Sequence, residues 1–151
     1  MATATKTSAR RTGRPSRGEE VERRHQLLSA ALDVFLSQGF SDTSLDDIAR
    51  AARVAKRTIY EKFGGKEGLF AAAIERSATQ LIGRFPAIDQ TSGDIGGDLY
   101  AIGCTVLDFV LQPRSLAIYR LVAGEAGRQP MLAQMFYEQG PGRAMASVAG
   151  L

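Results

Sequence analysis

A short run of basic and hydroxyl-bearing side chains has the clearest chemistry in this sequence. The run consists of Lys56, Arg57, Thr58, Tyr60 and Lys62. Within it, Ile59 and Phe63 are four residues apart, so in a helix they share one face and leave the polar groups on the other. Ammonium and guanidinium groups neutralise phosphates, and a guanidinium can also donate two hydrogen bonds to guanine. The pattern therefore indicates nucleic-acid recognition rather than catalysis.

The residues before this run predict the elements that position it. Ser44 can cap a helix, and Asp47 three residues later can complete a capping box. An apolar stripe at helical spacing follows the cap, formed by Leu45, Ile48 and Ala49. Together, residues 44–63 have the layout of a helix-turn-helix, in which the second helix enters the DNA major groove. A solvent-exposed amphipathic hairpin is the alternative for this segment taken alone.

A second possible phosphate contact follows the predicted recognition helix. Gly64 or Gly65 can end that helix, and Gly65 can cap the next one. Lys66 then lies in the first turn of a new helix, beside backbone N–H groups without helical partners, which is a favourable place for a DNA phosphate. An ordinary surface lysine is the alternative.

The positive charge of the chain is concentrated in its first half. Residues 1–70 contain 13 lysines and arginines against 9 acidic residues, whereas residues 71–151 contain 6 against 7, which gives the net +3 of the chain. The first 18 residues carry Lys6, Arg10, Arg11, Arg14 and Arg17 without an acid. We expect residues 1–18 to form a disordered basic arm that can reach phosphates or a minor groove. A solubilising tail is the alternative.

Hydrophobic periodicity and helix breakers predict an all-α fold. The expected helices cover about residues 19–37, 44–52, 56–63, 66–83, 94–111, 113–127, 130–139 and from 143 onward, with a linker at 86–93. No segment has the pattern of a strand, and no internal repeat is found.

Several functional classes are disfavoured by the composition. The single cysteine, Cys104, excludes a disulfide framework, and no apolar run is long enough for a membrane span or a signal-peptide core. The only histidine, His25, lies on the polar side of a predicted helix. No residue cluster has metal-ligand spacing, and no nucleophile or phosphate-loop motif occurs. We therefore expect a cytoplasmic protein that is not an enzyme, with no cofactor, no metal and no membrane partner.

Several sequence blocks resemble the TetR family of bacterial transcriptional regulators. The blocks are residues 31–35 with 39–40, 43–49, 58–63 and 66–70. In the second half, residues 119–125 and 136–141 are similar to the regulatory domain of the AefR-like members. The resemblance implies a helix-turn-helix DNA-binding domain at 19–80 and a partial helical regulatory and dimerisation domain at 81–151. It also implies a homodimer that binds a palindromic operator in double-stranded DNA and responds to a small-molecule inducer, most often as a repressor.

The resemblance also assigns candidate site residues. The DNA contacts it implies are Thr43 or Ser44, Lys56, Arg57, Thr58, Tyr60, Lys62 and Lys66. Among them Tyr60 and Lys66 correspond to phosphate contacts, and Lys56, Arg57 and Thr58 are the candidates for reading bases. The middle helices of the second half suggest an inducer pocket formed by Tyr100, Cys104, Leu107, Tyr119, Val122, Met135 and Phe136. For each of these residues, ordinary helix-bundle core is the alternative.

The sequence departs from the family pattern in three places. Arg53 stands where the turn usually has glycine, which predicts a strained left-handed residue. Ala55 replaces the usual serine or threonine cap of the recognition helix. Family members usually continue for about two more helices after the point that corresponds to Leu151, so we expect a fragment or a truncated product. A truncated ligand-binding or interaction module without specific DNA binding is therefore the alternative function.

Overall fold

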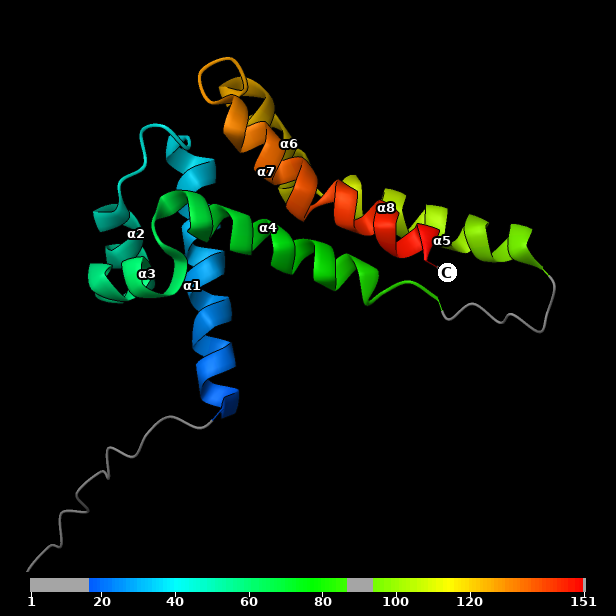
Figure 1. The fold of residues 1–151 in the computed structure, drawn as a ribbon, viewed down its shortest axis with the longest axis horizontal. Coiled ribbons are helices and arrows are strands. Elements are labelled where there is room, and N and C mark those ends of the chain that lie inside the picture. Colours follow the sequence, from blue (N-terminus) through cyan, green and yellow to red (C-terminus); the bar gives the residue numbers. More distant parts are fainter. Residues whose placement is uncertain (1–16, 87–93, 151) are drawn as a thin grey trace, which may run out of the picture.

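In the computed structural model, the described residues, 17–86 and 94–150, form eight helices and no strand (Figure 1). The helices are α1 (Arg17–Gln38), α2 (Leu45–Ala52), α3 (Lys56–Phe63), α4 (Lys66–Ile82), α5 (Ile95–Val110), α6 (Pro113–Glu125), α7 (Pro130–Gln139) and α8 (Pro141–Ala149). The predicted all-α fold is confirmed, and each predicted helix is present.

Two predicted helix starts were wrong by two residues. Helix α1 begins at Arg17, so Arg17 and Gly18 are helical rather than part of the arm, and Glu19 and Glu20 in the first turn favour this start. The remainder of the predicted arm, and most of the linker, lie outside the described residues. Helix α8 begins at Pro141 rather than near Arg143, because proline fits the first turn of a helix.

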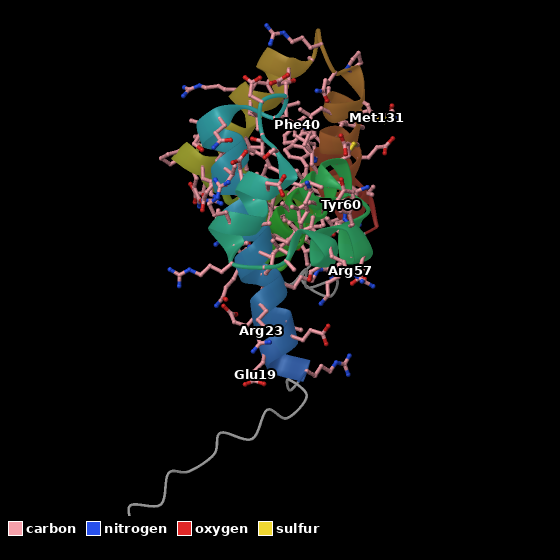
Figure 2. The ribbon with its side chains drawn as sticks, turned by 90° about the vertical axis from the view of Figure 1, so that its left-hand side faces the viewer. Glu19, Arg23, Phe40, Arg57, Tyr60 and Met131 are labelled. Atoms are coloured by element: carbon pink, nitrogen blue, oxygen red, sulfur yellow. The ribbon has the colours of Figure 1, made fainter. Side chains whose placement is uncertain are left out.

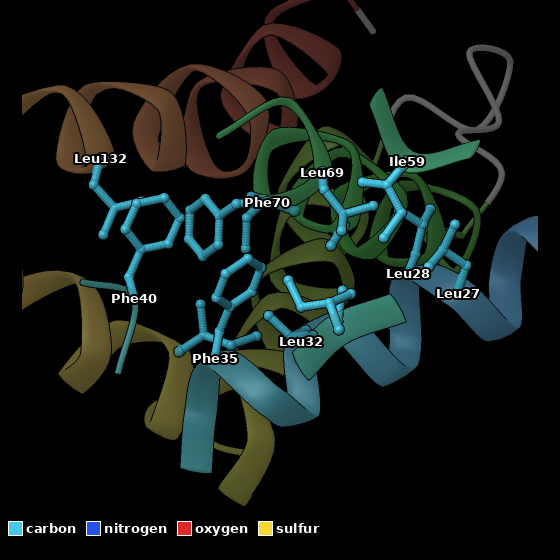
Figure 3. Close-up of a cluster of buried hydrophobic side chains, with 14 of the residues drawn as sticks. Leu27, Leu28, Leu32, Phe35, Phe40, Ile59, Leu69, Phe70 and Leu132 are labelled. Carbon is cyan, nitrogen blue, oxygen red and sulfur yellow. The ribbon is translucent and has the colours of Figure 1, made fainter. Parts of the chain in front are cut away.

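Three phenylalanines form the centre of the core (Figure 3). Phe35 of α1, Phe40 of the following turn and Phe70 of α4 are fully buried, with ring centroids 5.1–5.7 Å apart. Phe35 and Phe40 are stacked, and both meet Phe70 edge to face, which is a favourable arrangement of aromatic rings. Leu132 of α7 joins the same cluster, so the core ties the first half of the chain to the second.

Helix α4 is the element common to both halves of the molecule. It packs against α1 and α3 near its start and against α7, α8 and α5 further along (Figure 1). Its buried side chains follow helical spacing and include Leu69, Phe70, Ala73 and Ile74. The helix-turn-helix therefore packs on one end of α4, and the other end of α4 packs against helices of the second half.

Helices α5 to α8 bury few side chains. Only Ile102 is buried in α5, Leu132 in α7 and Ala144 in α8. Large apolar side chains of these helices and of the segments beside them are exposed instead, namely Ile95, Leu99, Tyr100, Leu107, Val110, Leu111, Tyr119, Met131, Tyr137 and Met145. Among the described helices none is both long and apolar enough to cross a membrane by itself, although the bent pair α5 and α6 together has the necessary length and composition.

Candidate nucleic-acid interface

The first helix of the motif starts with a complete capping box. The Asp47 backbone N–H donates to the Ser44 hydroxyl oxygen at 3.2 Å, and the Ser44 N–H donates to the Asp47 carboxylate at 3.3 Å. The hydrogen bonds from Ser44 hold the pKa of Asp47 below its usual value. The predicted cap is confirmed, and it commits the side chain of Ser44 to α2.

The turn between α2 and α3 is held by a left-handed arginine. Arg53 has φ 55° and ψ 43°, and it is the only non-glycine residue with positive φ in the described part of the chain. Its N–H and that of Val54 donate to the last carbonyls of α2, at Arg50 and Ala49. The predicted left-handed conformation is confirmed, and the Arg53 side chain is exposed beside the start of α3.

Helix α3 presents a polar, mostly basic face. Ile59 is fully buried beneath it, and Lys56, Arg57 and Tyr60 are exposed. Figure 2 looks onto this end of the molecule and shows Arg57 and Tyr60 on the same side. Thr58 is half-buried, and Lys62 is exposed further along the helix. Among the predicted DNA contacts, Lys56, Arg57 and Tyr60 thus share one accessible surface.

No side chain caps the start of α3. Ala55 is the N-cap residue and has extended backbone angles, but it offers no side-chain acceptor to the free N–H groups of the first turn. The missing cap that the sequence predicted is therefore confirmed. These N–H groups point along the helix axis from the same end that carries Lys56 and Arg57.

Each basic residue of α3 forms an ion pair with an acid of the same chain. Lys56 Nζ lies 2.8 Å from Asp46 Oδ2, Arg57 Nε lies 2.5 Å from Glu61 Oε1, and Lys62 Nζ lies 3.1 Å from Glu20 Oε1. The hydrogen bond with Asp46 raises the pKa of Lys56. All three pairs are exposed, and exposed pairs are weak in water, so a phosphate or a base edge can replace the carboxylate.

Two predicted DNA contacts have structural roles instead. Thr43 is buried, with 3% of its surface exposed, and its hydroxyl donates to the Gly39 carbonyl at 2.6 Å. The Lys66 ammonium donates to the carbonyls of Phe40, Ser41 and Thr43 at 2.9, 3.2 and 3.1 Å, and it lies 4.8 Å from the centre of the Phe40 ring. Because an ammonium has three protons, these carbonyls take all of its donors. In this structure both side chains hold the turn between α1 and α2 rather than pointing to a ligand.

A glycine that sequence reasoning did not single out determines how α3 meets α4. A Cβ atom added to Gly68 would lie 1.9 Å from the Phe63 carbonyl oxygen, at the last residue of α3. Gly64, with φ 76°, ends α3, and Gly65, with φ 147°, begins the next turn. The close backbone approach at Gly68 lets α3 fold back against α4.

The predicted inducer pocket is not assembled. Tyr100, Cys104, Leu107 and Tyr119 are exposed on α5 and α6, because these helices leave much of their apolar surface uncovered. Val122 is buried, and the half-buried Met135 and Phe136 pack with it against the main core. The seven residues therefore do not line a common cavity.

Helix α6 and the segment that follows it provide polar contacts to the first half. Glu125 accepts hydrogen bonds from the Ser41 hydroxyl at 2.6 Å and from the Ser41 N–H at 3.3 Å, and these bonds lower the pKa of Glu125. Gln129 donates to the same hydroxyl at 3.0 Å. At the other end of α6, Arg114 pairs with Asp33 at 2.6 Å. The turn before the helix-turn-helix is therefore anchored to α6, a feature that sequence spacing alone does not reveal.

No cluster of three or more histidine, cysteine or acidic side chains in residues 17–86 and 94–150 could hold a metal ion. The single histidine, His25, is half-buried on α1.

Comparison with known proteins gives the same assignment for both halves. Residues 27–73 match the family described as bacterial regulatory proteins, tetR family, and residues 97–151 match the AefR-like transcriptional repressor C-terminal domain. Two relatives are the uncharacterized HTH-type transcriptional regulator YvkB of Bacillus subtilis and the HTH-type transcriptional activator FasR of Mycolicibacterium smegmatis. The chain is 31% identical to YvkB over 83 residues, which are 55% of this chain and 42% of YvkB. It is 34% identical to FasR over 89 residues, which are 59% of this chain and 41% of FasR.

The chain thus spans about two fifths of the length of these curated relatives. Among solved structures, it is similar to the flavonoid-responsive regulator FrrA, with a TM-score of 0.71 and 35% identity, covering 86% of this chain and 66% of FrrA. The relatives are transcriptional regulators, and theirs is not a family of enzymes. The two matches follow one another along the chain, and the chain belongs to the TetR family of bacterial transcriptional regulators.

Proposed function

We propose that this protein is a sequence-specific regulator of transcription that binds double-stranded DNA through α3 and responds to a small molecule. The exposed face of Lys56, Arg57 and Tyr60, on a helix that is fixed by a capped α2 and the close approach at Gly68, carries the proposal. Such a face has the width and charge for the major groove. In this role the protein acts by binding and not as an enzyme, and its place of action is the cytoplasm, where bacterial DNA lies.

The roles within the proposed site follow from exposure and reach. Arg57 and Lys56, at the N-terminal end of α3, read base edges, and Thr58 assists them. Tyr60 and Lys62 contact phosphates, together with the basic residues before residue 17, whereas Ser44 acts by capping α2. Thr43 and Lys66 act indirectly, because their polar groups are already bonded to the turn that orients the motif.

A homodimer would place two copies of α3 in successive major grooves of a palindromic operator, roughly 34–36 Å apart. In this proposal residues 19–80 form the DNA-binding domain, and residues 81–151 belong to the regulatory and dimerisation domain. The AefR-like match supports repression as the mode of action. Inducer binding then favours a spacing of the two α3 helices that no longer fits the operator.

The test is a fluorescence anisotropy titration of the chain with DNA from upstream of its own gene and with a scrambled duplex, over a series of salt concentrations. We expect tighter binding to the upstream DNA at every salt concentration. Equal, weak and steeply salt-dependent binding to both duplexes would indicate only electrostatic attachment. That result would favour the alternative, a ligand-binding or interaction module without specific DNA recognition.

A further inference from the structure

A cavity of about 170 Å³ lies where α1, α4 and the α5–α6 junction meet. Its apolar wall comes from all of these elements and includes Leu28, Leu32, Ala73, Phe109 and Ile118. None of the residues that the sequence suggested for an inducer pocket lines it. The cavity is thus bounded by the first helix of the DNA-binding half and by the first helices of the second half.

Three arginines line the remaining wall of this cavity. They are Arg76 and Arg84 of α4 and its C-terminal end, and Arg114 of α6. Neutral donors accompany them, among them Ser77 and Gln80. No aspartate or glutamate is part of the described lining, so the charged groups of the cavity wall are all positive.

Two of the guanidinium groups, those of Arg114 and Arg76, differ in their bonding. Arg114 is held by Asp33 at 2.6 Å and by the Ser29 carbonyl at 3.3 Å, so its charge is largely compensated. Arg76 forms no such contact, and its Nε atom is buried without an acceptor in the part of the chain that the structure describes. A buried N–H without an acceptor is unfavourable, and the ligand that relieves this best is an anionic oxygen.

We propose that this cavity binds a small organic carboxylate, with the carboxylate on Arg76 and Arg84 and an apolar body against Leu32, Ala73 and Ile118. The volume fits a single ring, because a protein cavity of about 150 Å³ can hold benzene. This site gives the ligand response of the proposed function a location and a chemical class, and to that extent it depends on the proposed function.

The position of the cavity explains how such a ligand would act on DNA binding. The ligand would touch α1 and α4, which carry the helix-turn-helix, and also the start of α6, which is tied to α1 through Arg114 and Asp33. A ligand that contacts both sides changes the relative stability of arrangements in which α1 and α6 lie closer together or further apart. The orientation of α3 follows α1 and α4, because α3 packs directly on α4.

The test uses benzoate as the probe, titrated calorimetrically into the full 151-residue chain without DNA at constant ionic strength. We expect saturable binding of one benzoate per chain, at least about tenfold weaker binding of the neutral benzamide, and at least about tenfold weaker binding of inorganic phosphate. Absence of saturable benzoate binding, or equal binding of benzamide or phosphate, would overturn the proposal.

Substitutions distinguish benzoate binding in this cavity from a general attraction of the anion to the positively charged chain. Arg76→Gln should weaken benzoate binding at least about tenfold, and Arg84→Gln, at an exposed residue, should weaken it severalfold. Arg120→Gln is the matched control, because Arg120 is an exposed arginine of α6 outside the cavity, and it should leave binding unchanged. An unchanged affinity in Arg76→Gln or Arg84→Gln, or an equal loss in the control, would contradict the site. Because DNA is absent, this result is independent of whether the chain binds an operator.

Discussion

The two halves of this chain, residues 17–82 and 95–150, use their apolar residues differently. In the first half, Phe35, Phe40, Phe70 and Ile59 are fully buried and fix the helix-turn-helix. In the second half, Tyr100, Tyr119 and other large apolar side chains of the helices face outward. The core of the first half is closed by its own helices together with Ile118, Val122 and Leu132 of the second half. The second half leaves apolar surface exposed, of the kind that contacts between subunits bury.

This contrast predicts where substitutions should affect both stability and DNA binding. The geometry of α2 and α3 depends on local features, namely the Ser44 cap, the Arg53 turn and the Gly68 approach. Changes to these features should alter stability and DNA binding together. Changes to exposed residues of α5 to α8 should leave the stability of the isolated chain nearly unaffected.

The largest effect is expected when the same substitution, glycine to alanine, is compared between the two halves. Gly68→Ala should destabilise the chain by about 3 kcal/mol, because the new Cβ atom would collide with the Phe63 carbonyl, which is backbone and cannot move aside. Gly103→Ala is the matched control within α5, where a Cβ atom meets nothing within 4 Å, and it should stabilise by about 0.5–1 kcal/mol. Urea denaturation measures both values. If both substitutions raised, or both lowered, the free energy of unfolding, the close approach at Gly68 would not be what makes glycine necessary there.

The next effect concerns the lysine that holds the turn before α2. Lys66→Met keeps most of the side-chain length but leaves three carbonyls without their donor, so we expect a loss of about 1–3 kcal/mol in the free energy of unfolding. DNA affinity should fall as well, with an unchanged dependence on salt, because no phosphate contact is lost.

Lys62→Met is the control for Lys66→Met. The ion pair of Lys62 with Glu20 is exposed, so the substitution should barely change stability, while it reduces the dependence of DNA binding on salt because a proposed phosphate contact is lost. If Lys66→Met instead preserved stability and lowered the salt slope, Lys66 would be a phosphate contact after all.

A smaller effect is expected at the uncapped start of α3. Ala55→Ser introduces a hydroxyl at an N-cap residue whose backbone is already extended, so it should stabilise the chain by about 1 kcal/mol. The same substitution at exposed Ala123, in the interior of α6, offers no cap and should slightly destabilise. Thermal melting followed by circular dichroism distinguishes the two. No stabilisation in Ala55→Ser would mean that another group already satisfies these N–H groups.

The smallest effect depends on pH and tests the contact between the halves. Hydrogen bonds from Ser41 lower the pKa of Glu125 in the folded state, so this residue stabilises the fold above its unfolded pKa of about 4.5. The stabilisation is lost as the pH falls through the lower, folded pKa. Glu125→Gln should therefore lower the melting temperature at pH 7, and the loss should become smaller as the pH falls below 4.5. A loss of the same size at every pH would point to packing rather than to the charge.

The sequence predicted the first half well because its signals are local. The Ser44 capping box, the left-handed Arg53 and the missing cap at Ala55 each depend on a few neighbouring residues, and all three are present in the structure. Helix boundaries marked by Gly64, Pro113 and Pro130 were likewise predictable, because these residues restrict the backbone directly.

The features that sequence reasoning missed depend on contacts between distant residues. Lys66 lies on the correct helix for a phosphate contact, yet its ammonium turns to carbonyls 23–26 positions earlier in the chain. Glu125 reaches Ser41 across 84 positions. The cavity beside Arg76 is formed by α1, α4 and α6 together, and no spacing within one helix encodes it.

The central claim is that the exposed face of α3 selects DNA by sequence. The most direct test compares operator and scrambled DNA affinities for Arg57→Ala, Lys62→Ala and the control Arg120→Ala. Arg57→Ala should reduce the preference for the operator by about tenfold or more, corresponding to about 1–3 kcal/mol for a bidentate contact with a base. Lys62→Ala should weaken both duplexes alike, and Arg120→Ala should change neither. If Arg57→Ala kept the full preference for operator over scrambled DNA, or if Arg120→Ala lost as much of that preference, recognition by this face of α3 would be contradicted.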